Sequence, residues 1–373
     1  MTVDEQTLER PATTLPDGLA GDLSREIRAL SVDEWGEGRA LDLVGRSAEF
    51  VEVLKKLRKV ADYDEPVLLI GESGSGKELM AEALYLMSER KGRPFVPVNC
   101  PQFTEGNLTV SELFGHRRGS FTGAVENRKG AFERADGGLI FLDEIGDLHP
   151  AAQAMLLRAL ASGEFQPLGS DETRAVSVRV VAATNRTLDK LINTDEFRED
   201  LYFRLRYFLI RVPPLRERGD DWRLLLAHVL GRLRRRHRVE KRFSSRALTL
   251  LETYEWPGNV RQLISVVTTG YALADGELIE PEDFEVQLEM PERRRVDIVD
   301  ELYRKISGGE SFWDCVHRPF LDRDLNRGQL KAFIRRGLHD VGGSYRDLLE
   351  HVGLATSDYQ KFMDFLRHHD LKP

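Results

Sequence analysis

Short apolar runs alternate with helix-like patterns over the first two thirds of the chain. Residues 67–70, 139–142 and 178–182 are mostly apolar and have the length of strands that are buried on both faces of a sheet. Between them lie segments with apolar residues at helical spacing, such as residues 151–160. This alternation predicts an α/β fold in which helices cover both faces of a parallel sheet.

The pattern changes at Pro213. From there to about residue 275 the apolar spacing is helical, so we assign residues 42–213 to an α/β subdomain and residues 214–290 to a helical lid. Pro281 and the charged residues 291–295 have the composition of a linker.

The beginning of the chain follows neither pattern. Residues 1–41 mix proline, glycine, threonine and acidic residues without a sustained period. This composition predicts a flexible tail that holds one short helix near residues 23–30.

Charge and composition narrow the class of protein. The formal net charge of −8 over 373 residues provides no overall attraction to nucleic acid, so any contact with DNA has to be local. The first residues lack a secretory signal, and no apolar run is long enough to span a bilayer. Cys100 and Cys315 match no metal-binding spacing. We therefore expect a cytoplasmic protein without membrane contact.

A glycine-rich segment follows the first apolar run and precedes a helical pattern, which is the context of a phosphate-binding loop. Backbone N–H groups of such a loop surround the phosphates, and its lysine neutralises their charge. The predicted ATP-binding residues are Gly71, Glu72, Ser73, Gly74, Ser75, Gly76, Lys77 and Glu78. Glu78 stands where a serine or threonine hydroxyl usually binds Mg²⁺.

Polar side chains follow the second and third apolar runs. We expect Asp143 to hold Mg²⁺ and Glu144 to polarise a water for attack on the γ-phosphate. Asn185 follows the third run. Because the carboxyl ends of parallel strands share one edge of a sheet, these side chains should meet there.

Together the segments resemble the AAA+ ATPases that activate sigma-54 RNA polymerase, the bacterial enhancer-binding proteins. The resemblance covers about residues 42–275. Besides the phosphate loop and Asp143-Glu144, its motifs are Leu43-Val44-Gly45-Arg46-Ser47, Glu112-Leu113-Phe114-Gly115-His116, Gly119-Ser120-Phe121-Thr122-Gly123-Ala124, Ala135-Asp136-Gly137-Gly138, Ala183-Thr184-Asn185-Arg186, Phe197-Arg198-Glu199-Asp200-Leu201, Pro213-Pro214-Leu215-Arg216-Glu217-Arg218 and Trp256-Pro257-Gly258-Asn259-Val260-Arg261. The family also tends to carry glutamate at the position of Glu78.

The resemblance implies roles for residues around the nucleotide. Asn185 is expected to sense the γ-phosphate, and Arg261 to act as a second sensor from the lid. Asn99 matches an asparagine that pairs with the catalytic glutamate, here Glu144.

Two arginines imply an assembly. Arg198 and Arg204 match the family's arginine fingers, which reach the ATP bound to a neighbouring subunit. The active form is therefore expected to be a ring, by resemblance a hexamer.

Residues 119–124 indicate what the ATPase acts on. A phenylalanine and a threonine between glycines predict that Phe121 and Thr122 lie at the tip of an exposed hairpin, and an exposed phenylalanine is typical of an interaction site. By resemblance, Phe121, Thr122 and Gly123 grip sigma-54, and ATP hydrolysis moves them to remodel the closed promoter complex. The family has alanine where this chain has Ser120.

Residues 297–373 are expected to form a small helical module. Three helical patterns are separated by Gly342-Gly343 and by Gly353, and they resemble the helix-turn-helix of the factor-for-inversion-stimulation type that this family uses to bind enhancer DNA. The last helix offers phosphates little net attraction, because its charged residues include Asp358, Lys361, Asp364 and Arg367. DNA binding and protein interaction both stay open for this module.

Two other functions fit parts of the sequence. An AAA+ remodeller of a different target would need no segment like residues 119–124. A scaffold that binds ATP without hydrolysing it would need neither the catalytic carboxylates nor the arginine fingers. Residues 232–238 are rich in arginine, and the sequence favours a solvated helix face over a DNA-binding patch for them.

Overall fold

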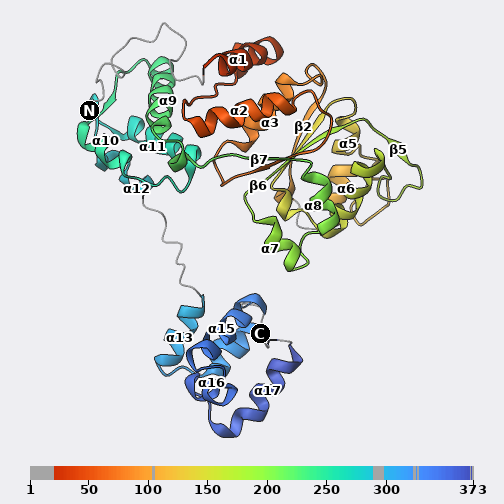
Figure 1. Ribbon diagram of the computed structural model, residues 1–373, viewed down its shortest axis with the longest axis vertical. Coiled ribbons are helices and arrows are strands. Elements are labelled where there is room, and N and C mark those ends of the chain that lie inside the picture. Colours follow the sequence, from red (N-terminus) through yellow and green to blue (C-terminus); the bar gives the residue numbers. More distant parts are fainter. Residues whose placement is uncertain are drawn as a thin grey trace. The chain divides into compact units, whose positions relative to one another are not determined.

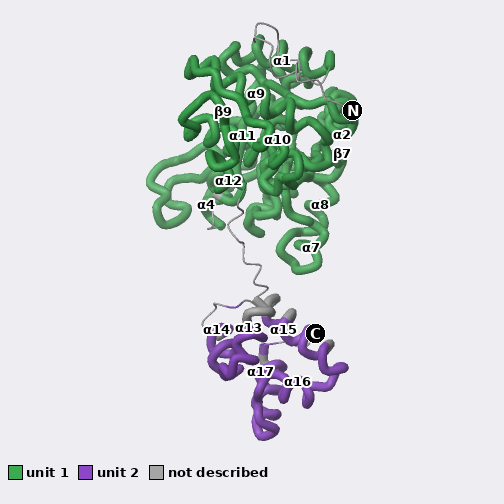
Figure 2. The backbone as a smooth tube through the Cα atoms, turned by 90° about the vertical axis from the view of Figure 1, so that its left-hand side faces the viewer, with its two compact units in different colours: residues 1–288 green, residues 289–373 purple. Residues whose placement is uncertain are grey.

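The chain forms two compact units, residues 1–288 and residues 289–373 (Figure 2). The structure is a computed structural model that describes residues 21–102, 106–288, 298–321, 325, 327–369 and 371. Among these residues no helix is both long and apolar enough to cross a bilayer.

A five-stranded parallel sheet forms the centre of the first unit (Figure 1). The strand order is β2-β3-β6-β1-β7, so β6 lies between the strand that precedes the phosphate loop and the strand that ends in the acidic pair. The strands are β1 (Val67–Ile70), β2 (Phe95–Asn99), β3 (Leu139–Asp143), β6 (Arg179–Thr184) and β7 (Phe208–Arg211). This is the parallel sheet that the apolar runs predict.

Alternate residues of each strand enter two different cores. In β1, Val67 and Leu69 pack into one core while Leu68 packs into the other, as the period of two in a strand requires. One core is covered by α1 (Gly21–Trp35), α2 (Ala48–Val60) and α3 (Lys77–Met87). The other is covered by α4 (Gly106–Phe114), α5 (Ala131–Arg134), α6 (Pro150–Ser162), α7 (Leu188–Asn193) and α8 (Glu199–Leu205).

The prediction of a flexible tail is wrong for residues 21–41. Ile27 of α1 is fully buried in the first core. The hydroxyl of Tyr85 in α3 donates a hydrogen bond to the carboxylate of Glu34 at 2.6 Å, and its ring stacks on Trp35. Leu23, Ile27 and Leu30 form a short apolar stripe on this core, which is interrupted by polar residues and therefore shows no sustained period in the sequence. Residues 1–20 lie outside the described residues.

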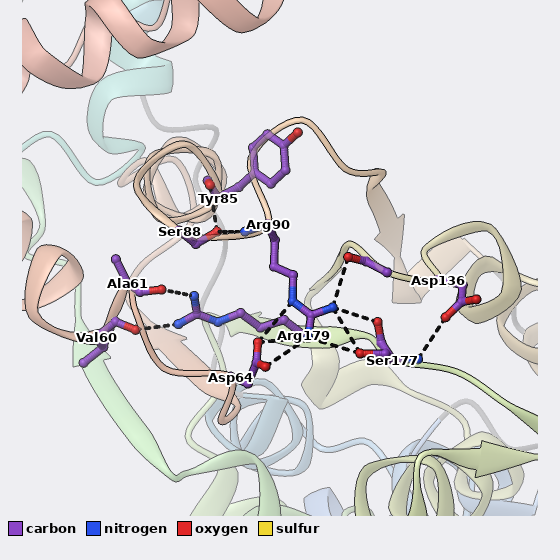
Figure 3. A network of polar contacts seen from close by, with 10 residues as sticks. Val60, Ala61, Asp64, Tyr85, Ser88, Arg90, Asp136, Ser177 and Arg179 are labelled. Atoms are coloured by element: carbon purple, nitrogen blue, oxygen red, sulfur yellow. Dashed lines mark hydrogen bonds and ion pairs between the residues drawn. The ribbon is translucent and has the colours of Figure 1, made fainter.

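Two arginines hold the amino ends of the strands (Figure 3). Arg179 begins β6, is 1% exposed, and donates hydrogen bonds of 2.6 Å to the carbonyl oxygens of Val60 and Ala61 where α2 ends. Burial lowers the pKa of Arg179 to about 10, so it stays charged at neutral pH and complements the negative end of the helix. Arg90 pairs beside it with Asp64 at 3.0 Å. These contacts fix the sheet edge opposite the expected site.

The lid follows the sheet and has its own core. It consists of α9 (Asp221–His237), α10 (Ser245–Glu252), α11 (Asn259–Leu273), α12 (Glu285–Leu288) and the paired strands β8 (Arg242–Phe243) and β9 (Leu278–Ile279). Pro281, which we expected in a linker, is buried in a helical turn of the lid, and Phe284 and Leu288 join the lid core. The proline begins that turn, where a missing N–H group costs nothing.

The second unit is helical, as predicted. Its helices are α13 (Ile298–Ser307), the π-helix Trp313–His317 that continues into α14 (Arg318–Leu321), α15 (Arg327–Asp340), α16 (Tyr345–His351) and α17 (Tyr359–His368). The apolar residues that predicted the last three helices are largely buried in one core, including Phe333, Leu348 and Phe362. Gly342, Gly343 and Gly353 have positive φ angles at the turns between them.

Candidate functional site

The carboxyl ends of four strands bring the predicted catalytic residues to one edge of the sheet. The parallel register pairs Asn99 at the end of β2 with Asp143 at the end of β3. The N–H group of Gly71 after β1 donates to the carbonyl of Thr184 at the end of β6, at 3.2 Å. The next residue, Asn185, therefore lies beside the start of the phosphate loop.

Lys77 is the centre of this edge. Its side chain is only 6% exposed, and its Nζ donates to the carbonyl oxygens of Gly71 at 3.0 Å and Glu72 at 3.3 Å. It also lies 3.5 Å from the carboxylate of Glu144. A lysine held by carbonyl groups at the start of a helix is placed to exchange them for phosphate oxygens.

The loop around Lys77 requires glycine. Gly74 has a φ of +74°, and a Cβ there would lie 2.5 Å from the carbonyl oxygen of Gly258 in the lid. Gly76 has a φ of +102°. The Ser75 hydroxyl is buried and has no hydrogen-bond partner among the described residues. A cradle of backbone N–H groups with an unpartnered donor beside it fits phosphate groups.

The acidic pair has the geometry of a strained functional turn. Glu144 adopts a φ of +51°, which is uncommon for a residue with a side chain. One carboxylate oxygen accepts a hydrogen bond from the N–H group of Asn185 at 2.9 Å while the other faces Lys77. Burial raises the pKa of Asp143, with Lys77 lowering it and Glu78 adding a smaller increase. The carboxylate oxygens of this edge are of the kind that a divalent cation prefers as ligands.

The expected pairing of Asn99 with Glu144 stays a prediction. Asn99 lies at the same sheet edge, and its side chain is exposed. The described contacts of the Glu144 carboxylate are with Lys77 and Asn185.

The lid contacts the phosphate loop through Arg261, which the sequence predicted, and through Asn259, to which it gave no role. Arg261, the predicted second sensor, donates to the Ser73 hydroxyl at 2.9 Å. Asn259 is fully buried, and its amide donates to the Glu72 carboxylate and the Ser73 carbonyl at 3.1 and 3.0 Å. It also accepts from the N–H group of Leu215 at 2.7 Å. The signal for Asn259 was its place in the Trp-Pro-Gly-Asn motif.

A second set of contacts joins the lid to the beginning of the α/β subdomain. Asp221 accepts hydrogen bonds from the N–H groups of Arg46 and Ser47 at 2.6 and 3.1 Å. Arg218 pairs with Asp221 at 3.0 Å and donates to the carbonyl of Val44 at 2.7 Å. A Cβ at Gly45 would come within 2.7 Å of both charged side chains. The position therefore accepts only glycine.

The predicted arginine fingers lie away from this subunit's phosphate loop. Arg198 precedes α8 and pairs with Asp200 at 2.7 Å, which raises the pKa of Arg198. Arg204 donates to the carbonyl of Leu160 at the end of α6, at 2.9 and 3.2 Å. Each guanidinium group is thus held by a residue of its own subunit, and the reach of these arginines to a neighbour's ATP stays a prediction.

The segment of residues 119–124 forms a loop whose base is fixed. His116 and Arg128 exchange backbone hydrogen bonds of 3.0 and 2.9 Å below it. The N–H group of Arg117 donates to the carbonyl of Leu168, which lies between β4 (Glu164–Phe165) and β5 (Arg174–Ala175). A Cβ at Gly169 would lie 2.5 Å from the Cβ of Ser120. The loop thus rests on the β4–β5 hairpin.

The exposed tip of this loop differs from the prediction. Thr122 and Gly123 are exposed as expected, but Phe121 is half-buried, with its ring edge-on to His116 at 5.1 Å between ring centres. Val125, which sequence reasoning did not single out, is 79% exposed. An aromatic ring gains more by packing on a neighbour than by facing water, and His116 supplies that neighbour.

Comparison with known proteins identifies the family. Residues 43–211 match the sigma-54 interaction domain, and residues 216–298 match the AAA+ ATPase lid domain. The chain is 40% identical over 364 residues to the nitric oxide reductase transcription regulator NorR2 of Cupriavidus necator, covering 91% of this chain and 67% of that protein. The chain belongs to the sigma-54-dependent AAA+ transcriptional activators. The predicted family, the fold and the ATPase class are thereby confirmed.

Other relatives of this activator match over a smaller part of their length. The transcriptional regulatory protein ZraR of Salmonella typhimurium is 42% identical over 274 residues, 73% of this chain and 60% of that protein. The nif-specific regulatory protein of Azotobacter vinelandii is 49% identical over 221 residues, 59% and 42% of the two chains. The chain therefore spans about half the length of these two relatives. The crystal structure of NtrX from Brucella abortus in complex with ATP matches with a TM-score of 0.62 and 25% identity, covering 89% of this chain and 70% of that one.

Proposed function

We propose that this activator uses ATP hydrolysis to move residues 119–124 against sigma-54, and so remodels the closed promoter complex of RNA polymerase. The observation that carries the proposal is the joining of Lys77, Glu144 and Asn185 at one sheet edge of the subdomain that also presents Thr122 to solvent. The match of residues 43–211 to the sigma-54 interaction domain supports the choice of partner.

The chemical roles follow from the contacts. Lys77 neutralises the outer phosphates, and Glu144 orients the attacking water and takes its proton. Asp143 and Glu78 supply carboxylate oxygens for Mg²⁺, which when bound stabilises negative charge on the phosphates. The N–H group of Asn185 holds Glu144, so the loss of the γ-phosphate next to Asn185 alters the position of this carboxylate.

A packed path leads from Glu144 toward the loop. The turn Ile145–Asp147 that follows Glu144 contacts the turn Cys100–Gln102 that follows β2. Further on, a Cβ at Gly106, the first residue of α4, would lie 2.6 Å from the ring of His149. At the other end of α4, the Ser111 hydroxyl contacts the His116 ring at 2.6 Å, at the base of the loop. A shift of the acidic turn can therefore be passed to residues 119–124.

Assembly into a ring completes the site in this proposal. Arg198 and Arg204 of one subunit reach the γ-phosphate bound to the next, with a hexamer as the expected ring. A finger supplied in trans contributes about 10³–10⁵ to the rate of related phosphoryl transfers. An isolated subunit should then hydrolyse ATP very slowly.

Thr122→Ala tests the proposed contact with sigma-54. Because Thr122 is exposed and remote from Lys77, the variant should retain ATP turnover while losing transcription from a sigma-54 promoter. Both activities are measured on one preparation, with Glu126→Ala, another exposed position of the same segment, as the matched control. Full transcription by Thr122→Ala would refute the proposed contact.

Glu144→Gln separates an ATPase from an ATP-binding scaffold. The variant keeps the side-chain shape but removes the base, so ATP should still bind while phosphate release falls by about 10²–10⁴. Unchanged transcription by this variant would favour the scaffold.

For the second unit we propose enhancer DNA binding, with a helical protein-interaction module as the alternative. The turns and helices after residue 327 support a helix-turn-helix arrangement. A gel shift with upstream promoter DNA at two salt concentrations distinguishes the two, because phosphate contacts produce a steep salt dependence.

A further inference from the structure

The C-terminal end of α9 carries a cluster of arginines that the proposed function leaves unused. Residues 232–242 contain seven arginine and lysine side chains and one carboxylate, in a chain of net charge −8. Two of the seven are engaged: Arg234 holds the carbonyl of Lys241 and pairs with Glu240 at 3.2 Å, and Lys241 donates to the carbonyl of Ala274. Within residues 232–242, the exposed cations for which the described residues supply no ion pair are Arg232, Arg235, Arg236, Arg238 and Arg242.

Such a cluster is unusual in this protein. Elsewhere many surface arginines pair with carboxylates, as Arg246 does with Glu282 and the half-buried Arg117 with Glu172. Exposed arginines without a described ion pair, such as Arg39 and Arg158, do not gather as five within eleven residues. Five neighbouring guanidinium groups without paired carboxylates repel one another, and this repulsion lowers the stability of the lid when no partner is bound.

Stabilisation of the helix end explains only part of the cluster. Cations complement the negative end of a helix within its last turn. Arg232 lies more than one turn before the end of α9 at His237, and Arg242 lies beyond it in β8. Arg232, Arg235 and Arg236 instead share the solvent face, opposite the buried Leu226 and Val229. Neighbours at this spacing lie about 5–6 Å apart at Cβ.

We propose that residues 232–242 of the lid form a binding surface for the phosphate backbone of duplex DNA. The planar guanidinium group binds phosphate through two parallel hydrogen bonds, and the cluster consists of arginine. Among the described residues of the cluster only Val239 is an exposed apolar side chain, whereas a protein partner would require an apolar or aromatic centre. The surface therefore binds DNA without reading its sequence.

The last helix of the second unit offers phosphates few free cations. In α17, the helix expected to enter the groove, Lys361 lies over the Trp313 ring at 4.0 Å and Arg367 pairs with Asp364 at 3.2 Å. Both cations of this helix are thus engaged within their own unit. A lid surface that holds phosphates supplies the attraction that α17 lacks.

The test is fluorescence anisotropy of a labelled 30-base-pair duplex of scrambled sequence, titrated with the full chain at several salt concentrations without nucleotide or polymerase. For the triple variant Arg232→Gln, Arg235→Gln and Arg236→Gln, the slope of log affinity against log salt should decrease by about 2.7, since each phosphate contact contributes about 0.9. The matched control is Lys55→Gln, Lys56→Gln and Lys59→Gln on α2, which removes the same charge from a surface that also carries Glu49 and Glu52. Its slope should stay at the parent value.

Retained ATP turnover shows that each variant is folded. If the triple glutamine variant loses ATP turnover, the single variant Arg235→Gln should still reduce the slope by about 0.9. Exchange of the same three arginines for lysine should leave the slope at the parent value. An unchanged slope in the glutamine variants, an equal loss in the α2 control, or no binding by the parent chain would each overturn the proposal. Because neither ATP nor sigma-54 is present, these outcomes do not depend on the proposed function.

Discussion

The nucleotide edge and the loop of residues 119–124 belong to the same subdomain but are held in opposite ways. At the edge, Lys77 and Asn259 are buried and each has three polar partners. In the loop, the hydrogen bonds join its own backbone groups, such as the Gly119 N–H group and the Ala124 carbonyl at 2.8 Å, and a Cβ at Gly119 or Gly123 would meet nothing within 4 Å. Phosphoryl transfer needs atoms fixed to a fraction of an ångström, whereas a surface that engages and releases a partner needs room to move.

The largest effect on ATP turnover is expected from a residue that lies outside both regions. Arg204→Ala should reduce ATP turnover by about 10³–10⁵ if the edge is complete only with a neighbour's finger. Arg206→Ala, a nearby exposed arginine, is the matched control. Mixing the Arg204→Ala and Glu144→Gln proteins should restore part of the activity, because some interfaces then join an intact finger to an intact site. No recovery on mixing would argue against a finger in trans.

The next test loosens the edge through the lid. Asn259→Ala leaves the Leu215 N–H group and the Ser73 carbonyl without their buried partner, and places alanine at a φ of +52°. The expected loss is about 2–4 kcal/mol of unfolding free energy, read as a lower thermal midpoint, with weaker ATP binding. Asn259→Gly relieves the backbone strain and should recover only part of the loss. Full recovery by glycine would mean that the hydrogen bonds contribute little.

A smaller effect is expected where the loop rests on the β4–β5 hairpin. In Gly169→Ala the new Cβ meets Ser120 at 2.5 Å, so the loop has to shift. Transcription should fall several-fold while ATP turnover is unchanged. Gly137→Ala is the control, because Gly137 has a similar φ of +77° but no atom within 4 Å of its Cβ. If the two variants reduced transcription equally, the loss of transcription would come from backbone strain of about 1–2 kcal/mol rather than from the contact with Ser120.

The smallest effect is expected from Ser120→Ala. The Ser120 hydroxyl is buried and lacks a hydrogen-bond partner among the described residues. Its removal should raise the unfolding free energy by up to about 1 kcal/mol and leave transcription unchanged, measured as a shift in the thermal midpoint and by promoter assay. A loss of transcription would show that the hydroxyl contacts sigma-54.

Local patterns were enough to predict the nucleotide edge. Lys77, Asp143 and Asn185 each follow an apolar run, and a parallel sheet brings such positions together without further information. The lid contacts of Asn259 and Asp221 were not predictable in this way. Their contacts with Glu72, Arg46 and Ser47 join residues more than 170 positions apart along the chain, so no local spacing reveals them.

The misplaced features have a common physical cause. Phe121 and residues 21–41 were judged from their immediate sequence, which is polar or rich in glycine. In the structure each packs on a side chain outside its own run: His116 at the base of the loop for Phe121, and Tyr85 of α3 for the helix α1. Packing against a neighbour that the immediate sequence does not indicate overrides local composition.

Helix α1 has a practical consequence for anyone who shortens this protein. Its side chains cover α3, the helix that begins with Lys77. An ATPase fragment trimmed at the family boundary near residue 43 would strip this cover and leave the phenol of Tyr85 without its carboxylate acceptor. Fragments for biochemistry should therefore begin before Gly21. Poor solubility of a shorter fragment would result from the loss of α1 and would not be a property of the intact ATPase.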